Sequence, residues 1–309
     1  MKQFHLIITI LVIAAAAINV SHAQVINSIN EQNMKIPRPT KQDNTKQQHK
    51  QLDTPIDTTT VYFQLVDSAQ HYAQLENWAK AETFILEALK SDPNNPNNSL
   101  LISNLATFQR LQGKTTQALK NYSLALDMTP NAVTLLLNRA ALYAQIDSLE
   151  LAQNDYKRVM KLDVLNIESR YHHGLIEIYR GNLAEAENDF FEILKIDPES
   201  SLANEGLAEL NKAAGNYTRA ILYYSKAIDK APTAALFANR ADCHLMVKHL
   251  NEAQADIESA LQINPNDGFI YLLRAKLNKF RYQNDEMKRD LQLAEKYGVD
   301  PNYIKALVQ

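Results

Sequence analysis

The chain has 309 residues, of which 46% are hydrophobic and 22% charged, a composition typical of a globular protein. The formal net charge of −3 and the isoelectric point near 6.3 exclude a strongly basic surface, so we expect no nucleic-acid partner. The single cysteine, Cys243, excludes an intramolecular disulfide and any zinc or redox motif built from several cysteines.

Residues 1–23 have the pattern of a secretory signal peptide. Lys2 gives a positive start, and an uncharged apolar stretch covers residues 6–20. Small residues then precede a predicted cleavage between Ala23 and Gln24, and no cysteine follows as a lipoprotein would need. The alternative is an uncleaved anchor, but the stretch is short for a span of about 20 residues. We therefore expect an exported bacterial protein, periplasmic or secreted, that keeps no stable membrane insertion after cleavage.

Residues 24–59 are rich in Gln and Asn and are interrupted by Pro37, Pro39 and Pro55. They show no helical apolar stripe, and such a segment cannot bury enough apolar surface to offset the entropy of ordering it. We interpret these residues as a flexible polar linker. A short structure packed on the edge of the folded part is the alternative.

Residues 60–299 repeat one unit seven times, with boundaries near 62–95, 99–132, 133–166, 167–200, 201–233, 234–267 and 268–299. Each unit reads as two helical stretches, and small residues recur at matched sites on both. The first-helix site holds Ala69, Ala106, Ala140, Gly174, Ala208, Ala241 and Ala275. The second-helix site holds Ala81, Ala118, Ala152, Ala186, Ala220 and Ala253, and then Met287.

Small side chains at facing sites allow two helices to approach to about 8–10 Å, so each unit is predicted to form an antiparallel helix hairpin. Gly113, Gly181 and Gly215 fall at the breaks between the paired helices, where the end of a helix favours a left-handed residue. Proline follows most of the second helices and stops them, as at Pro93 and Pro130.

This pattern resembles the tetratricopeptide repeat (TPR) family. The resemblance implies an all-α, right-handed superhelical solenoid of about seven hairpins. Residues 300–309 would add a capping helix that starts at Asp300 and Pro301. A solenoid of longer helical repeats is the alternative, and the observed period is short for it.

A correlation within the chain predicts ion pairs inside three hairpins. Arginine precedes the small first-helix residue only where aspartate lies three residues after the small second-helix site. The predicted pairs are Arg139–Asp155, Arg240–Asp256 and Arg274–Asp290. In the fourth unit, His173 and Asp189 take these places. We expect these pairs to be partly buried and structural.

No catalytic, cofactor-binding or metal site is expected. His172 and His173 are adjacent, so on a helix they point about 100° apart and cannot readily chelate one ion. Cys243 lies inside a first helix, where a small buried thiol is the simpler interpretation. The repeats leave no segment long enough for a separate catalytic domain.

The resemblance implies that a protein or an extended peptide binds the concave groove lined by first helices. Members often use Asn at a first-helix site to hold a peptide backbone. The predicted groove residues are Asn104, Asn138, Tyr171, Leu175, Tyr179, Glu205, Asn239, Asp242 and Lys276. Simple solvation, or packing between repeats for Tyr, is the alternative for each of them.

The predicted function is therefore a non-catalytic exported scaffold or adaptor, with a role in cell-envelope assembly as its most specific form. Two alternatives stay open at this point. The groove could recognise a glycan or an envelope polymer, to which the tyrosines near Tyr171 would contribute. The repeats could also form an accessory part of an enzyme.

Overall fold

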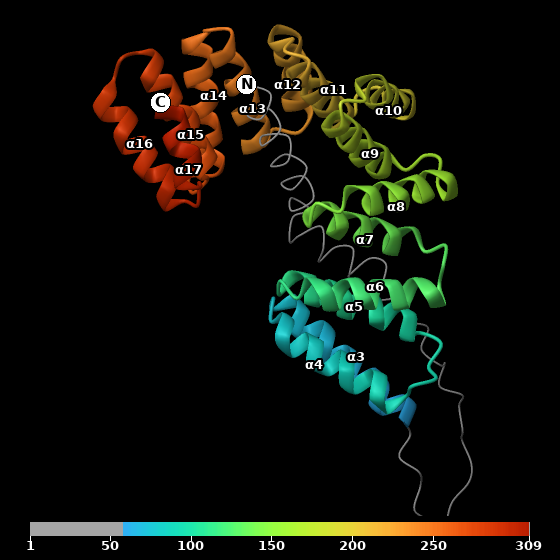
Figure 1. Ribbon diagram of the computed structural model, residues 1–309. Helices are drawn as coiled ribbons and strands as arrows, with labels where there is room; N and C mark the ends of the chain where they lie inside the picture. Colours follow the sequence, from blue (N-terminus) through green and yellow to red (C-terminus); the bar gives the residue numbers. More distant parts are fainter. Residues whose placement is uncertain (1–57, 309) are drawn as a thin grey trace, which may run out of the picture. The chain divides into compact units, whose positions relative to one another are not determined.

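The computed structural model describes residues 58–308, and within them it contains fifteen α-helices and no β-strand (Figure 1). The predicted signal peptide, its cleavage site at Ala23 and Gln24, and nearly all of the predicted linker lie outside the described residues. The all-α class predicted from the sequence is confirmed.

The described chain divides into two compact units, with the boundary between Val164 and Leu165. The N-terminal unit contains three helix hairpins, α3 (Thr58–Gln74) with α4 (Trp78–Ser91), α5 (Asn98–Leu111) with α6 (Thr115–Met128), and α7 (Val133–Gln145) with α8 (Leu149–Leu162).

The C-terminal unit contains four hairpins and a final helix. They are α9 (Ile167–Arg180) with α10 (Leu183–Ile196), α11 (Ser201–Ala213) with α12 (Tyr217–Lys230), α13 (Ala234–Met246) with α14 (Leu250–Ile263), α15 (Gly268–Phe280) with α16 (Asn284–Lys296), and α17 (Pro301–Val308). We number the hairpins one to seven in chain order. Inside each unit, the second helix of a hairpin also packs on the first helix of the next.

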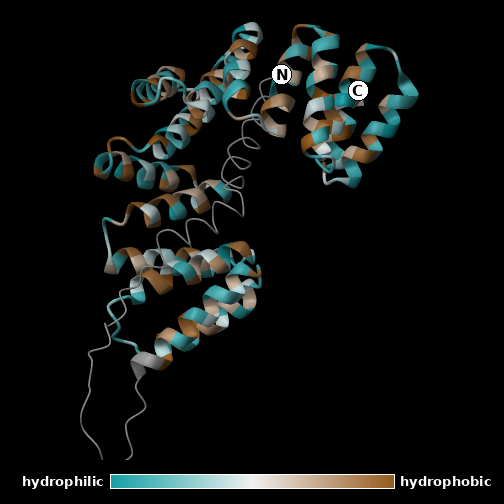
Figure 2. Ribbon diagram, turned by 180° about the vertical axis from the view of Figure 1, so that it is seen from behind, coloured by the Kyte–Doolittle hydropathy of each residue, from teal (hydrophilic) through white to brown (hydrophobic). Residues whose placement is uncertain are grey.

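The hairpins close around the repeated small residues. The first-helix and second-helix small sites are buried in all seven hairpins, including Met287 in the last one. Larger side chains fill the space beside them, and Tyr122, Tyr156 and Tyr224 are almost fully buried. The helices carry both apolar and polar residues, as the colouring of Figure 2 shows. The apolar face is buried because it meets both its partner helix and the next hairpin.

Two neighbouring first helices, α9 and α11, pack closely against one aromatic ring of hairpin four. A Cβ added to Gly206 of α11 would lie 2.3 Å from Phe190, and one added to Gly174 of α9 would lie 2.7 Å from the same ring. Phe190, on α10, is itself fully buried. The two glycines therefore make room for an aromatic ring between neighbouring first helices.

The turn of every hairpin contains one left-handed residue. Gly113, Gly181 and Gly215 have φ of 74°, 82° and 78°, as their positions in the sequence predicted. In the other four hairpins a residue with a side chain takes this conformation, at φ between 55° and 60°: Glu76, Asp147, Lys248 and Tyr282. A bulky aromatic residue is uncommon there, because its Cβ crowds the backbone.

The two ends of the repeat region differ slightly from the predicted boundaries. Helix α3 begins at Thr58, just inside the predicted linker 24–59. At the other end, α17 spans Pro301–Val308, and the Asp300 carboxylate accepts a hydrogen bond from the backbone N–H of Asn302 at 2.7 Å. The helix predicted to start at Asp300 and Pro301 is therefore present.

Candidate functional site

Three bidentate ion pairs join the two helices of their own hairpins. The guanidinium of Arg139 donates to Asp155 at 2.7 and 2.8 Å, and Arg240 donates to Asp256 at 2.8 and 2.6 Å. Arg274 donates to Asp290 at distances from 2.6 to 3.0 Å. The hydrogen bonds to aspartate raise the pKa of each arginine, although burial alone would lower it. All three pairs expected from the sequence are formed.

Two of these arginines also reach the preceding hairpin. Arg139 donates to the Ser123 hydroxyl at 3.1 Å, and Arg240 donates to the Ser225 hydroxyl at 2.8 Å. Ser123 and Ser225 occupy equivalent places on the second helices of hairpins two and five. The arginines therefore fix the contact between hairpins as well as the hairpin itself.

Hairpin four replaces arginine with histidine. The His173 ring places Nδ1 2.5 Å from an Asp189 carboxylate oxygen and Nε2 3.3 Å from a Glu177 carboxylate oxygen. Both ring nitrogens thus face acids of the hairpin, which agrees with the structural role expected for this histidine.

A connected set of polar side chains links the first helices of the C-terminal unit, and we call it the polar row. Its members come from α9, α11, α13 and α15, and they bond to side chains on neighbouring helices. The polar row consists of Tyr171, Glu205, Glu209, Lys212, Asn239, Asp242 and Lys276.

The centre of the polar row is one aspartate between two lysines. The carboxylate of Asp242 lies 3.4 Å from the Lys212 ammonium and 2.8 Å from the Lys276 ammonium. Burial favours the neutral acid, but the two lysines outweigh it and lower the pKa of Asp242. Burial would likewise lower the pKa of Lys212, but the carboxylates of Glu209 and Asp242 raise it above its ordinary value. The charges are therefore retained inside the protein because they are paired.

The other end of the polar row is acidic. Burial and the neighbouring Glu209 raise the pKa of Glu205 to about 7, although a hydrogen bond from Tyr171 lowers it in part. Burial also raises the pKa of Tyr171 well above its ordinary value, so the phenol stays protonated and can donate. The Tyr224 hydroxyl on α12 donates to Glu209. This end therefore contains a carboxyl group that titrates near neutrality.

The predicted groove residues fall into two groups. Tyr171, Leu175, Asn239 and Asp242 are only 3%, 2%, 8% and 5% exposed. The prediction treated these four as open to a partner, but they pack between helices, and the polar ones bond there. Asn239, for example, accepts a hydrogen bond from Lys212 of the preceding hairpin at 3.2 Å.

The remaining predicted groove residues are half-buried. They are Asn104, Asn138, Tyr179, Glu205 and Lys276. Asn104 and Asn138 lie in the N-terminal unit, on α5 and α7, and Tyr179 lies in the last turn of α9. Their contact with a partner stays a prediction.

Sequence reasoning missed Lys212 and the hydroxyl of Tyr224 as members of this set. Lys212 occupies the same position in its repeat as Lys279 does in the seventh repeat, and this recurrence of lysine could have identified Lys212 from the sequence. The ring of Tyr224 is fully buried beside the small residues of hairpin five, so its place in the repeat indicates only a core residue. The hydrogen bond of Tyr224 to Glu209 becomes evident only from the structure.

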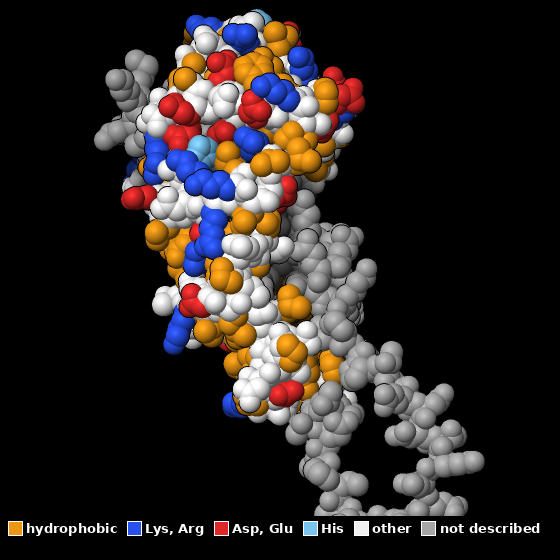
Figure 3. Space-filling view, turned by 90° about the vertical axis from the view of Figure 1, so that its right-hand side faces the viewer, with side chains coloured by type: hydrophobic (Ala, Val, Ile, Leu, Met, Phe, Trp, Pro, Cys, Tyr) orange, Lys and Arg blue, Asp and Glu red, His pale blue; other side chains and the backbone are white. Residues whose placement is uncertain are grey.

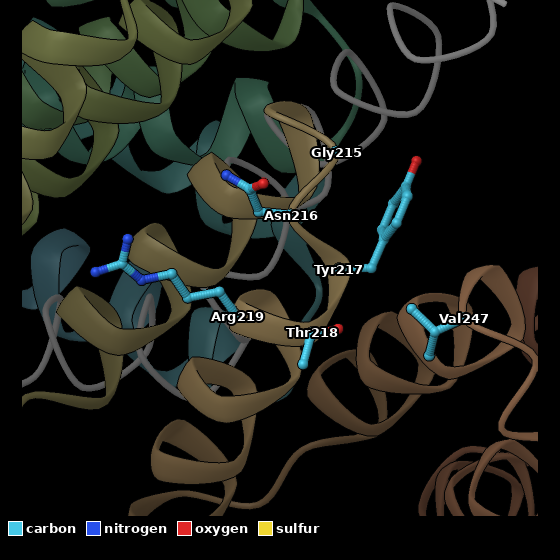
Figure 4. Close-up of a pocket in the computed structure, with 6 residues that line it drawn as sticks. All are labelled: Gly215, Asn216, Tyr217, Thr218, Arg219 and Val247. Atoms are coloured by element: carbon cyan, nitrogen blue, oxygen red, sulfur yellow. The ribbon is translucent and has the colours of Figure 1, made fainter.

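Two cavities lie near the turns of the C-terminal unit. One, of about 420 Å³, lies between the turns of hairpins five and six and is lined by Gly215, Asn216, Tyr217, Thr218, Arg219 and Val247 (Figure 4). The other, of about 520 Å³, lies at hairpin seven and is lined by Lys276, Lys279, Phe280, Tyr282 and Asn284. On the molecular face in Figure 3, basic and acidic side chains are interspersed.

The other groups considered from the sequence occupy structural positions. Burial raises the pKa of the Cys243 thiol to about 12 and lowers the pKa of His172 to about 4. The thiol and the imidazole are therefore both neutral at pH 7. Among residues 58–308, no group of three His, Cys, Asp or Glu side chains is arranged to hold a metal ion.

Within the same residues, no helix combines the length and the apolar character that crossing a bilayer requires.

Comparisons with known proteins agree with this architecture. A family model described as "Tetratricopeptide repeat" matches residues 171–235. The crystal structure of a tetratricopeptide repeat protein from Parabacteroides merdae is similar to this chain with a TM-score of 0.71 and 32% identity. The similarity covers 80% of this chain and 97% of that one.

Two curated relatives are both called DnaJ homolog subfamily C member 7 homolog. The protein from Schizosaccharomyces pombe is 29% identical over 173 residues, which cover 50% of this chain and 36% of the relative. The protein from Dictyostelium discoideum is 26% identical over 262 residues, which cover 76% of this chain and 48% of the relative. The chain thus spans less than half the length of either relative.

Proposed function

The chain belongs to the tetratricopeptide repeat family, and from this membership we propose that it is a non-catalytic scaffold that binds a protein or an extended peptide on its first helices. The polar row is the observation that carries the proposal. It ties four successive first helices together through paired side chains that are buried or half-buried. A face held in this way loses little conformational freedom when a partner binds, which favours affinity.

Export to the periplasm or the cell exterior, with a role in envelope assembly, is the second part of the proposal. Its support is the sequence pattern of residues 1–24, in which a positive start and an apolar stretch precede small residues. No nucleic acid and no lasting membrane insertion are part of this proposal.

Site-specific photocrosslinking in the native host tests the binding face. A photoreactive residue at Asn138 or Tyr179 places the probe on a first helix, at half-buried side chains of α7 and α9. Matched controls at Leu124 on α6 and Leu222 on α12 place it on second helices, where the side chains are 45% and 61% exposed. We expect a discrete crosslinked protein from the first-helix positions only. Equal or stronger crosslinking from the second-helix positions would reject the proposed face.

A further inference from the structure

Four positions of each first helix form one stripe along it: six and three residues before the small first-helix residue, and one and four residues after it. In the C-terminal unit, this stripe contains six of the seven members of the polar row, and five of those six are acids or lysines. In the N-terminal unit, the same positions of α3, α5 and α7 contain one charged residue, Arg110. Its guanidinium bonds to the hydroxyl of Tyr122 within hairpin two. The two units therefore present different chemistry at equivalent positions.

We call these positions of α3, α5 and α7 the neutral face. Its large apolar members are Phe63, Val66, Leu100 and Leu137, and all four are half-buried. Helices α5 and α7 are in direct contact, so the stripes of these neighbouring first helices adjoin. The four side chains keep apolar surface that a further apolar segment could remove from water.

The sequence before α3 contains a segment of matching chemistry. The large apolar side chains of residues 24–51 all fall within residues 24–36: Val25, Ile26, Ile29, Met34 and Ile36. One acid and one lysine give residues 24–36 no net charge. Such a segment is too short to form a core of its own, but it can bury apolar side chains on a surface that is already folded.

The connection between this segment and α3 is long enough to reach the neutral face. Residues 37–57 join the segment to Thr58, the first residue of α3. A chain of about 21 residues spans on the order of 25 Å on average and roughly 70 Å at most. Two successive helix separations of about 8–10 Å, from α3 to α7, amount to roughly 20 Å. The segment is therefore present at a high local concentration beside the neutral face.

Charge favours the neutral face over the equivalent stripe of the C-terminal unit. There, apolar side chains would cover the carboxyl group of Glu205 and the ammonium group of Lys276, which are only half-buried. Removing such groups from water is unfavourable unless new partners pair with them. The neutral face has one charged group, and Tyr122 already bonds to it, so this cost is small there.

We propose that residues 24–36 dock on the neutral face of the same chain, with their apolar side chains against Phe63, Val66, Leu100 and Leu137. This corresponds to the packed alternative for residues 24–59 rather than to a free linker. The N-terminal unit then carries its own ligand, and a partner protein binds the first helices of the C-terminal unit or displaces the segment. The inference goes beyond the proposed function, because the docking requires no partner.

Disulfide formation tests the docking in the protein purified from its host. Ile29→Cys/Leu100→Cys places one thiol in the segment and one on the neutral face. The matched pair Ile29→Cys/Leu124→Cys places the second thiol on α6 of the same hairpin, where the side chain is 45% exposed. The native Cys243 is buried and its thiol is neutral at pH 7, so it does not compete. After reduction and mild oxidation, we expect the first pair to form an intrachain disulfide about tenfold faster or more, because docking raises the local concentration of one thiol at the other.

Two further variants separate docking from random encounter of the thiols. Ile26→Asp/Met34→Asp, added to the first cysteine pair, keeps the chain length and should slow disulfide formation to the rate of the matched pair. The reason is that burying a carboxylate against apolar side chains is unfavourable. Asn27→Asp/Asn33→Asp adds the same charge at polar positions of the segment and should keep the fast rate.

Three results would overturn the docking. They are equal rates for the two cysteine pairs, a fast rate that Ile26→Asp/Met34→Asp does not change, and a disulfide between chains that forms faster as the protein concentration rises. The last result would assign the segment to a second copy. Photocrosslinks from Tyr179, in the C-terminal unit, report a partner protein whichever result is obtained. Failure of the docking is therefore distinguishable from failure of the proposed function.

Discussion

At the scale of single residues, the sequence predicted the contacts of the three arginines correctly, whereas several polar residues assigned to the groove are buried between helices. Arg139, Arg240 and Arg274 each find an aspartate sixteen positions later, and the sequence correlation alone indicated this. Both partners belong to one hairpin, so the spacing within one repeat determines their contact. A bidentate guanidinium–carboxylate pair also has a fixed geometry that suits a helix interface.

Removing one partner of such a pair should be costly. We expect Asp256→Ala to lower the free energy of unfolding by about 2–4 kcal/mol, because it leaves Arg240 without its buried anion. Hairpin five has Leu207 and Tyr223 at the corresponding sites, so the double variant Arg240→Leu/Asp256→Tyr copies a pairing that the chain already uses. Urea denaturation should show a smaller loss for the double variant than for Asp256→Ala. A larger loss would contradict a pairwise structural role.

Glu205 should make stability depend on pH. Its pKa is raised from 4.5 to about 7, so the folded protein holds this proton more tightly than the unfolded chain. The contribution of Glu205 to stability is therefore complete below about pH 4.5 and is lost as the pH rises through about 7. Glu205→Gln removes the ionisation and keeps an amide oxygen for Tyr171. At about pH 8 we expect it to exceed the wild type in unfolding free energy, on the order of 1 kcal/mol.

The comparison needs a control variant at an exposed carboxyl group. Glu187 is exposed on α10 of the same unit, and Glu187→Gln should follow the wild-type pH profile. Urea denaturation of the three proteins at about pH 5 and about pH 8 gives the difference directly. Parallel profiles for Glu205→Gln and the wild type would mean that Glu205 ionises in the folded protein as it does in the unfolded chain.

At the scale of elements, the ring of Phe190 fixes how closely α9 and α11 pack. Gly206→Ala should lower the unfolding free energy by about 1–2 kcal/mol. Overpacking against the buried ring costs about 1–3 kcal/mol, while alanine recovers up to about 1 kcal/mol of helix propensity. Combining it with Phe190→Leu should cost less than the sum of the two single changes, as expected for residues in contact. Strict additivity in denaturation experiments would show that the ring has room to move.

The elements themselves were predictable and their mutual contacts were less so. Repeated alanines located each hairpin, and Gly113, Gly181 and Gly215 located three turns. Asn239 was expected on an open face, yet Lys212, from the preceding hairpin, covers its amide oxygen. That contact depends on how one hairpin is displaced and rotated on the next, which no spacing within a repeat specifies. The same displacement makes Asp242 a shared anion.

At the scale of the whole chain, each of the two units has its own hydrophobic core. In the N-terminal unit, one cluster surrounds Tyr62 and Phe108 and another surrounds Tyr122 and Leu136. In the C-terminal unit, separate clusters surround Tyr224, Ile257 and Leu291. Such nearest-neighbour packing is typical of repeat proteins, in which stability is distributed along the chain.

The proposed export makes a prediction about the mature chain. Protein purified from the envelope or the medium of its host should begin at Gln24, because the small residues before it form the cleavage site. Mass spectrometry of the intact protein measures this, and Ala23→Leu should slow processing because a large side chain does not suit that position. Recovery of the chain with residues 1–23 still attached would contradict cleavage.

A left-handed residue recurs in the turn of each of the seven hairpins. The backbone there has nearly the same conformation whether the residue is glycine, an acid, lysine or tyrosine. Each hairpin therefore offers one turn position whose side chain can change while the buried small residues of the hairpin stay the same. Substitutions at these turn positions would change the exposed surface one residue at a time and leave the packing of the hairpins unchanged.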